Sequence, residues 1–182
     1  MRIFIALDIP DEIRGRMEEY MERARQYAPE ARWARIEGLH VTLKFVGEVN
    51  ESRLQEFKGA LSAVRAASFD VGFENAGFFP TSKSPRVFWI GVQAGEALPQ
   101  LAAHIDQSLR KMGVACEERD YNPHLTLARA GTPGSLKGLA PLLELEAPPQ
   151  FGTMTVREFF LFQSQLGKGG AKYIKLEKFV LG

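Results

Sequence analysis

The heptapeptide from His40 to Val46, H-V-T-L-K-F-V, and the pentapeptide from His124 to Ala128, H-L-T-L-A, share the pattern H-x-T-L. Each stretch is short and apolar, which predicts a β-strand. Residues i and i+2 of a strand point to the same face, about 6.5–7 Å apart. Each motif therefore presents an imidazole and a hydroxyl side by side. We expect the alternate residues to face a core: Val41, Leu43 and Phe45 in one copy, Leu125 and Leu127 in the other.

The two motifs lie 84 residues apart, and other residues repeat at the same shift. Arg2-Ile3-Phe4 falls on Arg86-Val87-Phe88, and Gly47 falls on Gly131. The predicted order of strand, helix, strand, motif strand and hairpin also recurs. This duplication predicts an α+β fold in which residues 1–182 form one bilobal, pseudo-two-fold domain, with repeat halves of about 1–85 and 86–182. We expect two antiparallel sheets facing a central groove, with helices on the outer faces.

Hydrophobic periodicity places the individual elements along the chain. Apolar runs and alternating stretches predict strands over residues 2–7, 32–36, 40–46, 69–73, 87–92, 124–128, 154–162 and 173–180. Helical spacing of apolar residues predicts helices over 10–27, 54–67 and 98–112. Turn-forming residues predict loops over 80–85 and 164–171.

Composition limits the classes of function. The 182 residues include 23 Lys and Arg and 22 Asp and Glu, a net charge of +1, which argues against tracking along a polyphosphate backbone but permits a pocket for one phosphate. The one cysteine, Cys116, excludes an internal disulfide and a cysteine zinc cluster. The apolar run from Ile3 to Leu7 is too short for a signal peptide, and no stretch is long enough to span a membrane. We expect a soluble, cytoplasmic protein, monomeric by default.

Two imidazoles brought together across a groove could act as a general base and a general acid, because the ordinary pKa of histidine is about 6.5. The hydroxyls of Thr42 and Thr126 could donate to the oxygens of an anion. This arrangement suits in-line displacement at phosphorus. The alternative is a pair of structural histidines inherited by duplication. The nearest acidic residues, Asp8 and Asp120, have no metal-ligand spacing, so we expect catalysis without a metal or cofactor.

Several blocks of sequence extend the motifs into a family resemblance. They are R-I-F-I-A-L-D-I-P at the start, R-W followed by L-H-V-T-L-K-F-V-G-E, P-R-V-F-W-I-G-V, N-P-H-L-T-L-A-R, and the closing L-F-Q-S and A-K-Y-I-K-L. In this order, over nearly the whole chain, the sequence resembles the 2H phosphoesterase superfamily, and most closely its RNA 2′,3′-cyclic phosphodiesterase branch, formerly called 2′-5′ RNA ligase. The resemblance implies that one lobe combines both chain termini and that the middle of the chain forms the other.

The resemblance also implies the roles of the motif residues. His40 would protonate the 3′ oxygen as the cyclic phosphate opens, and His124 would activate the attacking water, leaving a 2′-phosphomonoester end. Thr42 and Thr126 would bind the non-bridging oxygens. The substrate would be RNA with a 2′,3′-cyclic phosphate end or a related nucleotide. The near-symmetry of the motifs means that the sequence itself cannot choose between acid and base.

Two alternatives remain open at this point. The same groups could join a 5′-hydroxyl to a 2′,3′-cyclic end, which would make the protein a 2′-5′ RNA ligase acting on tRNA halves. The motifs could instead belong to an RNA- or nucleotide-binding module without turnover.

Arg129 ends the second motif, and the resemblance makes it a candidate for binding phosphate. It has the parity of Leu125 and Leu127, so an unbroken strand would point it away from the groove. Only a bulge or a strand end at Ala128 would turn it back. The alternative is an exposed or salt-bridged arginine at the strand end.

Further candidates have weaker support. Residues of two loops could touch RNA at the rim of the groove, or be solvated: Ser82, Lys83, Gln165 and Lys168. Tyr121 or Phe45 could stack on a base, or pack in the core. We expect His104 and Cys116 to be structural.

Overall fold

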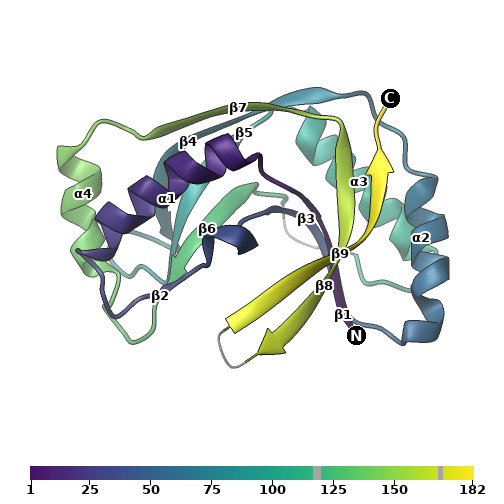
Figure 1. The fold of residues 1–182 in the computed structure, drawn as a ribbon, viewed down its shortest axis with the longest axis horizontal. Coiled ribbons are helices and arrows are strands. Elements are labelled where there is room, and N and C mark those ends of the chain that lie inside the picture. The colour runs from purple at the N-terminus through teal and green to yellow at the C-terminus, as the bar shows by residue number, and fades with distance from the viewer. Residues whose placement is uncertain (117–119, 168–169) are drawn as a thin grey trace.

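Two antiparallel β-sheets form the framework of the protein (Figure 1). The computed structural model describes residues 1–116, 120–167 and 170–182. Sheet A has the order β3 (Val41–Glu48), β1 (Arg2–Leu7), β8 (Glu158–Gly167) and β9 (Gly170–Val180). Sheet B has the order β2 (Arg32–Trp33), β6 (His124–Arg129), β5 (Val87–Gln93), β4 (Phe69–Phe79) and β7 (Gln150–Val156). Sheet A therefore contains both terminal strands, as the resemblance implied.

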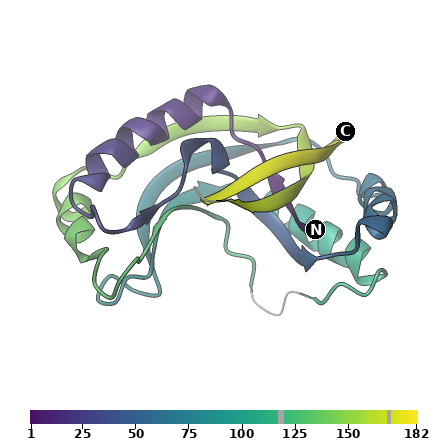
Figure 2. The same cartoon turned by 60° about the horizontal axis from the view of Figure 1, so that its bottom comes forward.

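Four α-helices pack on the sheets: α1 (Asp11–Arg25), α2 (Leu54–Ser62), α3 (Ala97–Arg110) and α4 (Ala140–Leu145). Short 3₁₀ turns are η1 (Ile36–Gly38), η2 (Glu51–Arg53) and η3 (Lys137–Leu139). Helix α1 follows β1 of sheet A but contacts β7 of sheet B. Helix α3 follows β5 of sheet B but contacts β3 of sheet A, and α2 contacts α3 and β9 (Figure 2). Helices α1 and α3 therefore each pack against the sheet that does not contain the strand preceding them.

The sequence of α1 shows why this helix packs as it does. Its buried residues recur every three or four positions and form one apolar stripe: Ile13, Met17, Tyr20, Met21 and Ala24. Asp11 and Glu12 lie in its first turn and Arg23 and Arg25 in its last, which complements the helix dipole.

No helix in the described part of the chain is long and apolar enough to cross a membrane.

One continuous apolar core joins both sheets and their helices. A second, smaller cluster lies on the other face of sheet A, because residues of alternate parity on β1 and β8 point away from that core. It consists of Phe4, Ala6, Phe160 and Phe162, with Tyr173 packed against them. This aromatic cluster lies beside the first motif.

The α+β architecture with two antiparallel sheets is confirmed, and several details differ from prediction. The predicted strand over 154–162 is two strands, β7 and β8, because the chain passes from sheet B to sheet A at Arg157. The predicted loop over 164–171 is mostly strand, since β8 continues to Gly167 and β9 begins at Gly170. Helix α4 was not predicted, and the described residues between α3 and β6 form no counterpart of β2.

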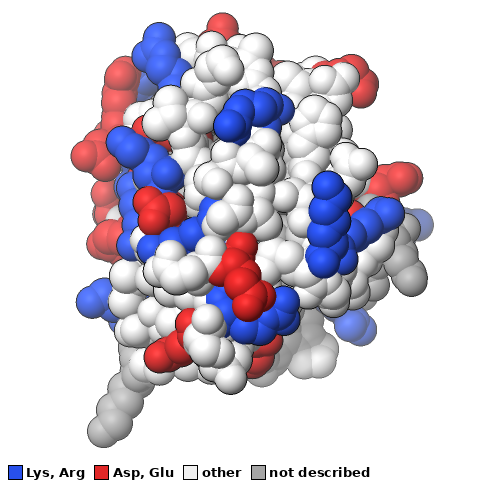
Figure 3. Space-filling view, turned by 90° about the vertical axis from the view of Figure 1, so that its right-hand side faces the viewer, with Lys and Arg blue, Asp and Glu red and all other residues white. Residues whose placement is uncertain are grey.

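Charge is mixed over the surface that covers α2. Figure 3 shows positive and negative side chains interspersed among uncharged ones on this face, with no continuous basic track. Ion pairs such as Lys58–Glu177, with 3.0 Å between Nζ and Oε2, account for part of this mixture. This face agrees with the near-neutral net charge.

Candidate active site

Each motif histidine lies at the start of a strand that pairs with the first strand of its repeat. His40 immediately precedes β3, which pairs with β1, and His124 opens β6, which pairs with β5. Strands β3 and β6 contact each other where the two sheets meet. The Tyr121 hydroxyl donates to the Thr42 carbonyl at 2.8 Å and so ties the segment before His124 to the first motif strand. Burial raises the pKa of the Tyr121 phenol, which keeps this donor protonated.

Both imidazoles are held by the same backbone arrangement. His40 Nδ1 lies 2.7 Å from the Gly38 carbonyl oxygen, and His124 Nδ1 lies 2.8 Å from the Asn122 carbonyl oxygen. In both cases the carbonyl belongs to the residue two positions upstream. Because a carbonyl can only accept, Nδ1 carries a proton in each ring. This leaves Nε2 of both histidines for proton transfer.

The surroundings of the two rings differ. Three aromatic rings lie near His40, with centroid distances of 4.7 Å to Phe4, 4.9 Å to Tyr173 and 6.2 Å to Phe162. One lies near His124, the Phe79 ring at 5.0 Å with its edge toward the imidazole. Burial lowers the pKa of His40 below its ordinary value of 6.5. The Gly38 carbonyl and the Asp8 carboxylate oppose this shift, and the Arg14 guanidinium adds to it.

A matching β-bulge lies one residue after each H-x-T. In β3, Thr42 pairs with Ala6 and Lys44 with Ile5, so that Leu43 is the extra residue. In β6, Thr126 pairs with Trp89 and Ala128 with Phe88, so that Leu127 is the extra residue. Two adjacent residues are buried at each bulge, and the residue that follows returns to the face of the histidine and threonine.

The bulges correct the expected position of Phe45 and resolve that of Arg129. Phe45 does not face the core; it is 61% exposed, because the bulge at Leu43 reverses the alternation. Arg129 is its counterpart in the repeat and is also exposed. The bulge at Leu127 thus returns Arg129 to the face of His124. This bulge lies one residue before Ala128, the position at which the sequence suggested that a bulge would be needed.

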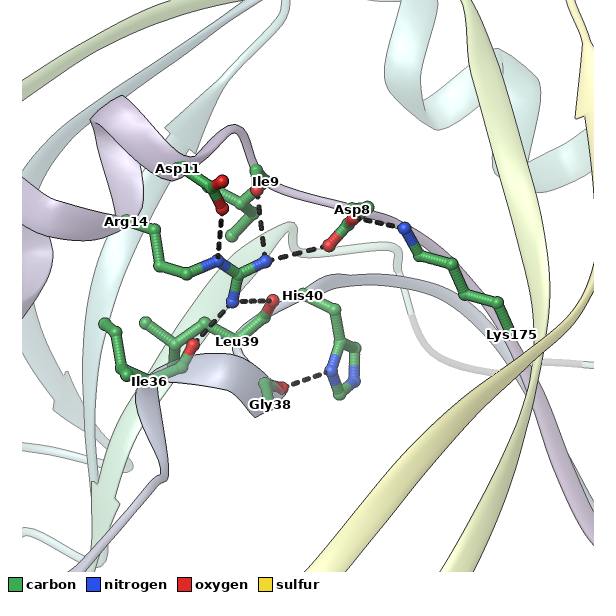
Figure 4. A network of polar contacts seen from close by, with 9 residues as sticks. All are labelled: Asp8, Ile9, Asp11, Arg14, Ile36, Gly38, Leu39, His40 and Lys175. Carbon is green, nitrogen blue, oxygen red and sulfur yellow. Dashed lines mark hydrogen bonds and ion pairs between the residues drawn. The ribbon is translucent and has the colours of Figure 1, made fainter.

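A network of polar contacts supports the turn that precedes His40 (Figure 4). Arg14 lies on α1, and its side chain is only 13% exposed. Its Nη1 donates to the carbonyl oxygens of Ile36 (2.5 Å) and Leu39 (3.3 Å), on either side of the Gly38 carbonyl that holds His40. Its Nη2 donates to Asp8 Oδ1 at 2.8 Å, and Lys175 Nζ donates to Asp8 Oδ2 at 2.5 Å. The network therefore joins α1 and β9 to the backbone of the first motif.

Sequence reasoning missed this network. It considered Asp8 as a metal ligand only to reject that role, and it gave Arg14 and Lys175 no role. The one available signal was the position of Asp8 in the block R-I-F-I-A-L-D-I-P. Among the described residues, no group of three or more His, Cys, Asp or Glu side chains has the spacing of a metal site.

The weaker candidates that the structure describes here are exposed and lie on different elements. Ser82 and Lys83 are exposed in the loop after β4, and Gln165 is exposed on β8, whereas Lys168 lies outside the described residues. His104 is exposed on α3. Cys116 is exposed and accepts a hydrogen bond from Arg110 Nη2.

A cavity of about 320 Å³ lies between α1 and the segment that includes the start of η1, and no residue of either H-x-T motif lines it. Its lining consists of Glu18, Met21, Arg25, Arg35, Ile36 and Glu37. No histidine or nucleophilic side chain lines it, so we place the candidate chemistry at the two motifs.

Comparisons with known proteins identify the family of this chain. Residues 9–168 match the family model described as the 2′-5′ RNA ligase superfamily. The RNA 2′,3′-cyclic phosphodiesterase of Archaeoglobus fulgidus is 35% identical, over 98% of this chain and 99% of the relative. The enzyme of the same name from Escherichia coli K12 is 30% identical, over 99% and 96%. The crystal structure of Escherichia coli LigT with 3′-AMP superposes with a TM-score of 0.81 at 30% identity, covering 99% of this chain and 97% of that one.

The family model spans most of the chain, and the relatives align over their full length. The prediction made from the paired motifs is thereby confirmed at the level of the family: the chain belongs to the 2′-5′ RNA ligase superfamily, within the 2H phosphoesterases.

Proposed function

We propose that this protein hydrolyses the 2′,3′-cyclic phosphate ends of RNA to 2′-phosphomonoester ends by paired-histidine acid–base catalysis. One observation supports this most directly. Each motif ring donates from Nδ1 to its own backbone carbonyl, so each leaves Nε2 available for proton transfer. The full-length relatives named RNA 2′,3′-cyclic phosphodiesterase support the substrate. The proposal treats residues 1–182 as one bilobal domain, in keeping with the core that joins both sheets.

The proposed reaction is an in-line displacement at phosphorus. His124 Nε2 takes a proton from water as the water oxygen bonds to phosphorus. The bond from phosphorus to the 3′ oxygen breaks, and His40 Nε2 gives its proton to that oxygen. The Thr42 and Thr126 hydroxyls donate to the non-bridging oxygens, where negative charge gathers. Arg129 adds a positive charge on the same face of β6.

The assignment of His40 as the acid comes from the family resemblance. It requires the His40 ring to be protonated when the leaving oxygen needs a proton. Burial lowers the pKa of His40, which favours the neutral ring in the free protein. A phosphodiester anion beside Nε2 favours the protonated ring. In this proposal the substrate therefore promotes protonation of the group that later protonates its leaving oxygen.

Single-turnover hydrolysis of an RNA oligonucleotide with a 2′,3′-cyclic end tests the proposal. We expect His40→Ala and His124→Ala each to slow the reaction about 10²- to 10⁴-fold. The product should carry its phosphate on the 2′ oxygen. Full activity in both variants would refute the assignment. Formation of a 2′-5′ linkage with a 5′-hydroxyl acceptor, in place of hydrolysis, would favour the ligase. Binding without any product would favour the binding module.

Metal removal is a second arm of the same assay. The two Nε2 atoms provide only two ligands, and both oxygens of Asp8, whose carboxylate acts on the pKa of His40, already accept from Arg14 and Lys175. We expect EDTA to leave the single-turnover rate unchanged. A loss of activity in EDTA that added metal restores would overturn the metal-free mechanism.

A further inference from the structure

Arg32 and Arg129 lie directly opposite each other on the antiparallel strands β2 and β6. Side chains at opposed positions share a face of the sheet, with Cβ atoms about 4.5–5.5 Å apart. Trp33, the next residue of β2, packs its ring against buried Phe88 at 6.1 Å. Arg32 therefore lies on the opposite face from Phe88. The bulge at Leu127 places Arg129 on that same face, together with His124 and Thr126.

The charge of this pair is not balanced by neighbouring acids. Within residues 1–116, 120–167 and 170–182, no carboxylate forms an ion pair with either guanidinium, and both side chains are exposed. Like charges directly opposite each other destabilise a sheet. An anion between the two guanidinium groups would remove that cost.

The geometry of Arg32 suits a phosphate. Its Nη2 donates to the Ala130 carbonyl oxygen at 3.1 Å, which holds the side chain along the end of β6. A guanidinium has five N–H donors, so others remain for a ligand. Its planar fork matches the oxygens of a phosphate better than a lysine ammonium does.

The position of the pair indicates which phosphate it binds. A strand rises about 3.3 Å per residue, so Arg129 lies up to about 10 Å beyond Thr126 and about 16 Å beyond His124 along β6. This is past the point where His124 and Thr126 would hold the reacting group. We propose that Arg32 and Arg129 form a subsite for an internucleotide phosphate of the RNA strand that leads to the cyclic end. The subsite rests on the proposed function and restricts it, because a cyclic mononucleotide cannot fill it.

The test compares two substrates: a nucleoside 2′,3′-cyclic monophosphate and an RNA trinucleotide with the same cyclic end. We expect Arg32→Gln to raise KM for the trinucleotide about tenfold and to change KM for the mononucleotide less than twofold. For the trinucleotide, the slope of log(kcat/KM) against log salt should fall by about 0.7, the value for one phosphate contact on a single strand. Arg32→Lys, which keeps the charge but loses the fork, should have an intermediate KM.

Arg23→Gln is the matched control. Arg23 is also an exposed arginine, but it lies on α1 over the ring of Tyr20. Its loss removes the same charge elsewhere on the protein, and we expect it to affect neither KM. Equal effects of Arg32→Gln on both substrates, or no effect on either, would overturn the subsite while leaving hydrolysis in place.

A wild-type protein that hydrolyses neither substrate would instead refute the proposed function. In that case, calorimetric measurement of the affinities of the two compounds for the wild-type protein and for Arg32→Gln still tests the subsite. A trinucleotide preference of wild type that Arg32→Gln abolishes supports the subsite, and equal affinities refute it.

Discussion

His40 and His124 are held in the same way but have different surroundings. Each ring donates from Nδ1 to a carbonyl two residues upstream, and each strand has its bulge one residue after the threonine. Three aromatic rings lie around His40 and one lies near His124. Arg14 donates to the carbonyls of Ile36 and Leu39 on either side of Gly38, whereas no side chain in the described part of the chain donates to the corresponding carbonyls of Asp120 and Pro123.

This comparison separates two properties of a catalytic histidine. Ring orientation depends on the local backbone, which the two halves share. Proton affinity depends on burial and neighbouring charges, which differ. A duplicated motif can therefore fix the same ring orientation twice, while the burial of one ring, that of His40, lowers its pKa. The two bulges also differ in the residue that they bury. Lys44 at the first bulge forms a buried ion pair with Asp106, whereas its counterpart at the second bulge is the buried Ala128.

After loss of the histidines themselves, the largest effect should come from removing the hydroxyls that the two halves have in common. We expect Thr42→Val and Thr126→Val each to slow single-turnover hydrolysis about 10²- to 10³-fold, because each removes a donor to the charged oxygens of the transition state. Valine has nearly the same shape, so folding should be kept. Comparable losses would show that the halves contribute equally to binding the phosphoryl oxygens.

Serine at the same positions is the control for these variants. Thr42→Ser and Thr126→Ser keep the hydroxyl and should keep most of the rate. A valine variant within threefold of wild type would remove its threonine from the mechanism.

A smaller effect should come from disrupting the network that only the first half has. We expect Arg14→Gln to lower kcat about tenfold with little change in KM, because the turn that orients His40 loses its donors. The ¹⁵N shifts of His40 should change and those of His124 should not. Leaving buried carbonyls unpaired should also lower the free energy of unfolding by about 1–3 kcal/mol.

Arg16→Gln is the matched control on the same helix. Arg16 Nη1 also donates to a backbone carbonyl, that of Phe151 at 3.0 Å, but on β7. Its loss should affect stability and leave kcat and the His40 shifts unchanged. If both variants lower kcat equally, Arg14 has only a structural role.

The architecture could be predicted because both of its signals are local. Apolar runs marked the strands, and the repeated H-x-T-L marked the sites. The division of residues 150–167 into β7 and β8 could not be predicted, since an apolar run that changes sheets at Arg157 has the same pattern as one long strand. Helix α4 has only six residues and begins beside a proline, which is too short for a periodic signal.

The residue types of the candidate site could be predicted from the sequence, but the bulges and the hydrogen-bond partners that position them could not. Strict alternation placed Phe45 in the core, and only a bulge, which strand patterning does not indicate, exposes it. The carbonyl partners of the two rings are backbone groups, so no residue type marks them. Arg14 and Lys175 are 161 residues apart and meet at Asp8 only through the tertiary fold.

The smallest effect should be a shift in the titration of His40. Burial lowers its pKa, so we expect His40 to titrate below pH 6.5 by NMR in the free protein. With His40 as the acid, kcat/KM should fall as the pH rises through that lowered pKa. Because the unfolded chain then binds more protons than the folded one, the contribution of His40 to stability should decrease as the pH falls through 6.5.

Tyr173 offers a way to remove the cause of this shift. Its ring lies edge-on to His40 at 4.9 Å, and Tyr173→Leu should admit water and move the pKa of His40 back toward 6.5. The alkaline limb of the kcat/KM profile should move with it, whereas Tyr173→Phe keeps the ring and should change neither. If His40 of the wild-type protein titrates at or above 6.5, the aromatic cluster does not set its proton affinity. If the limb that moves is instead the acidic one, where activity rises with pH, then His40 is the base and His124 the acid.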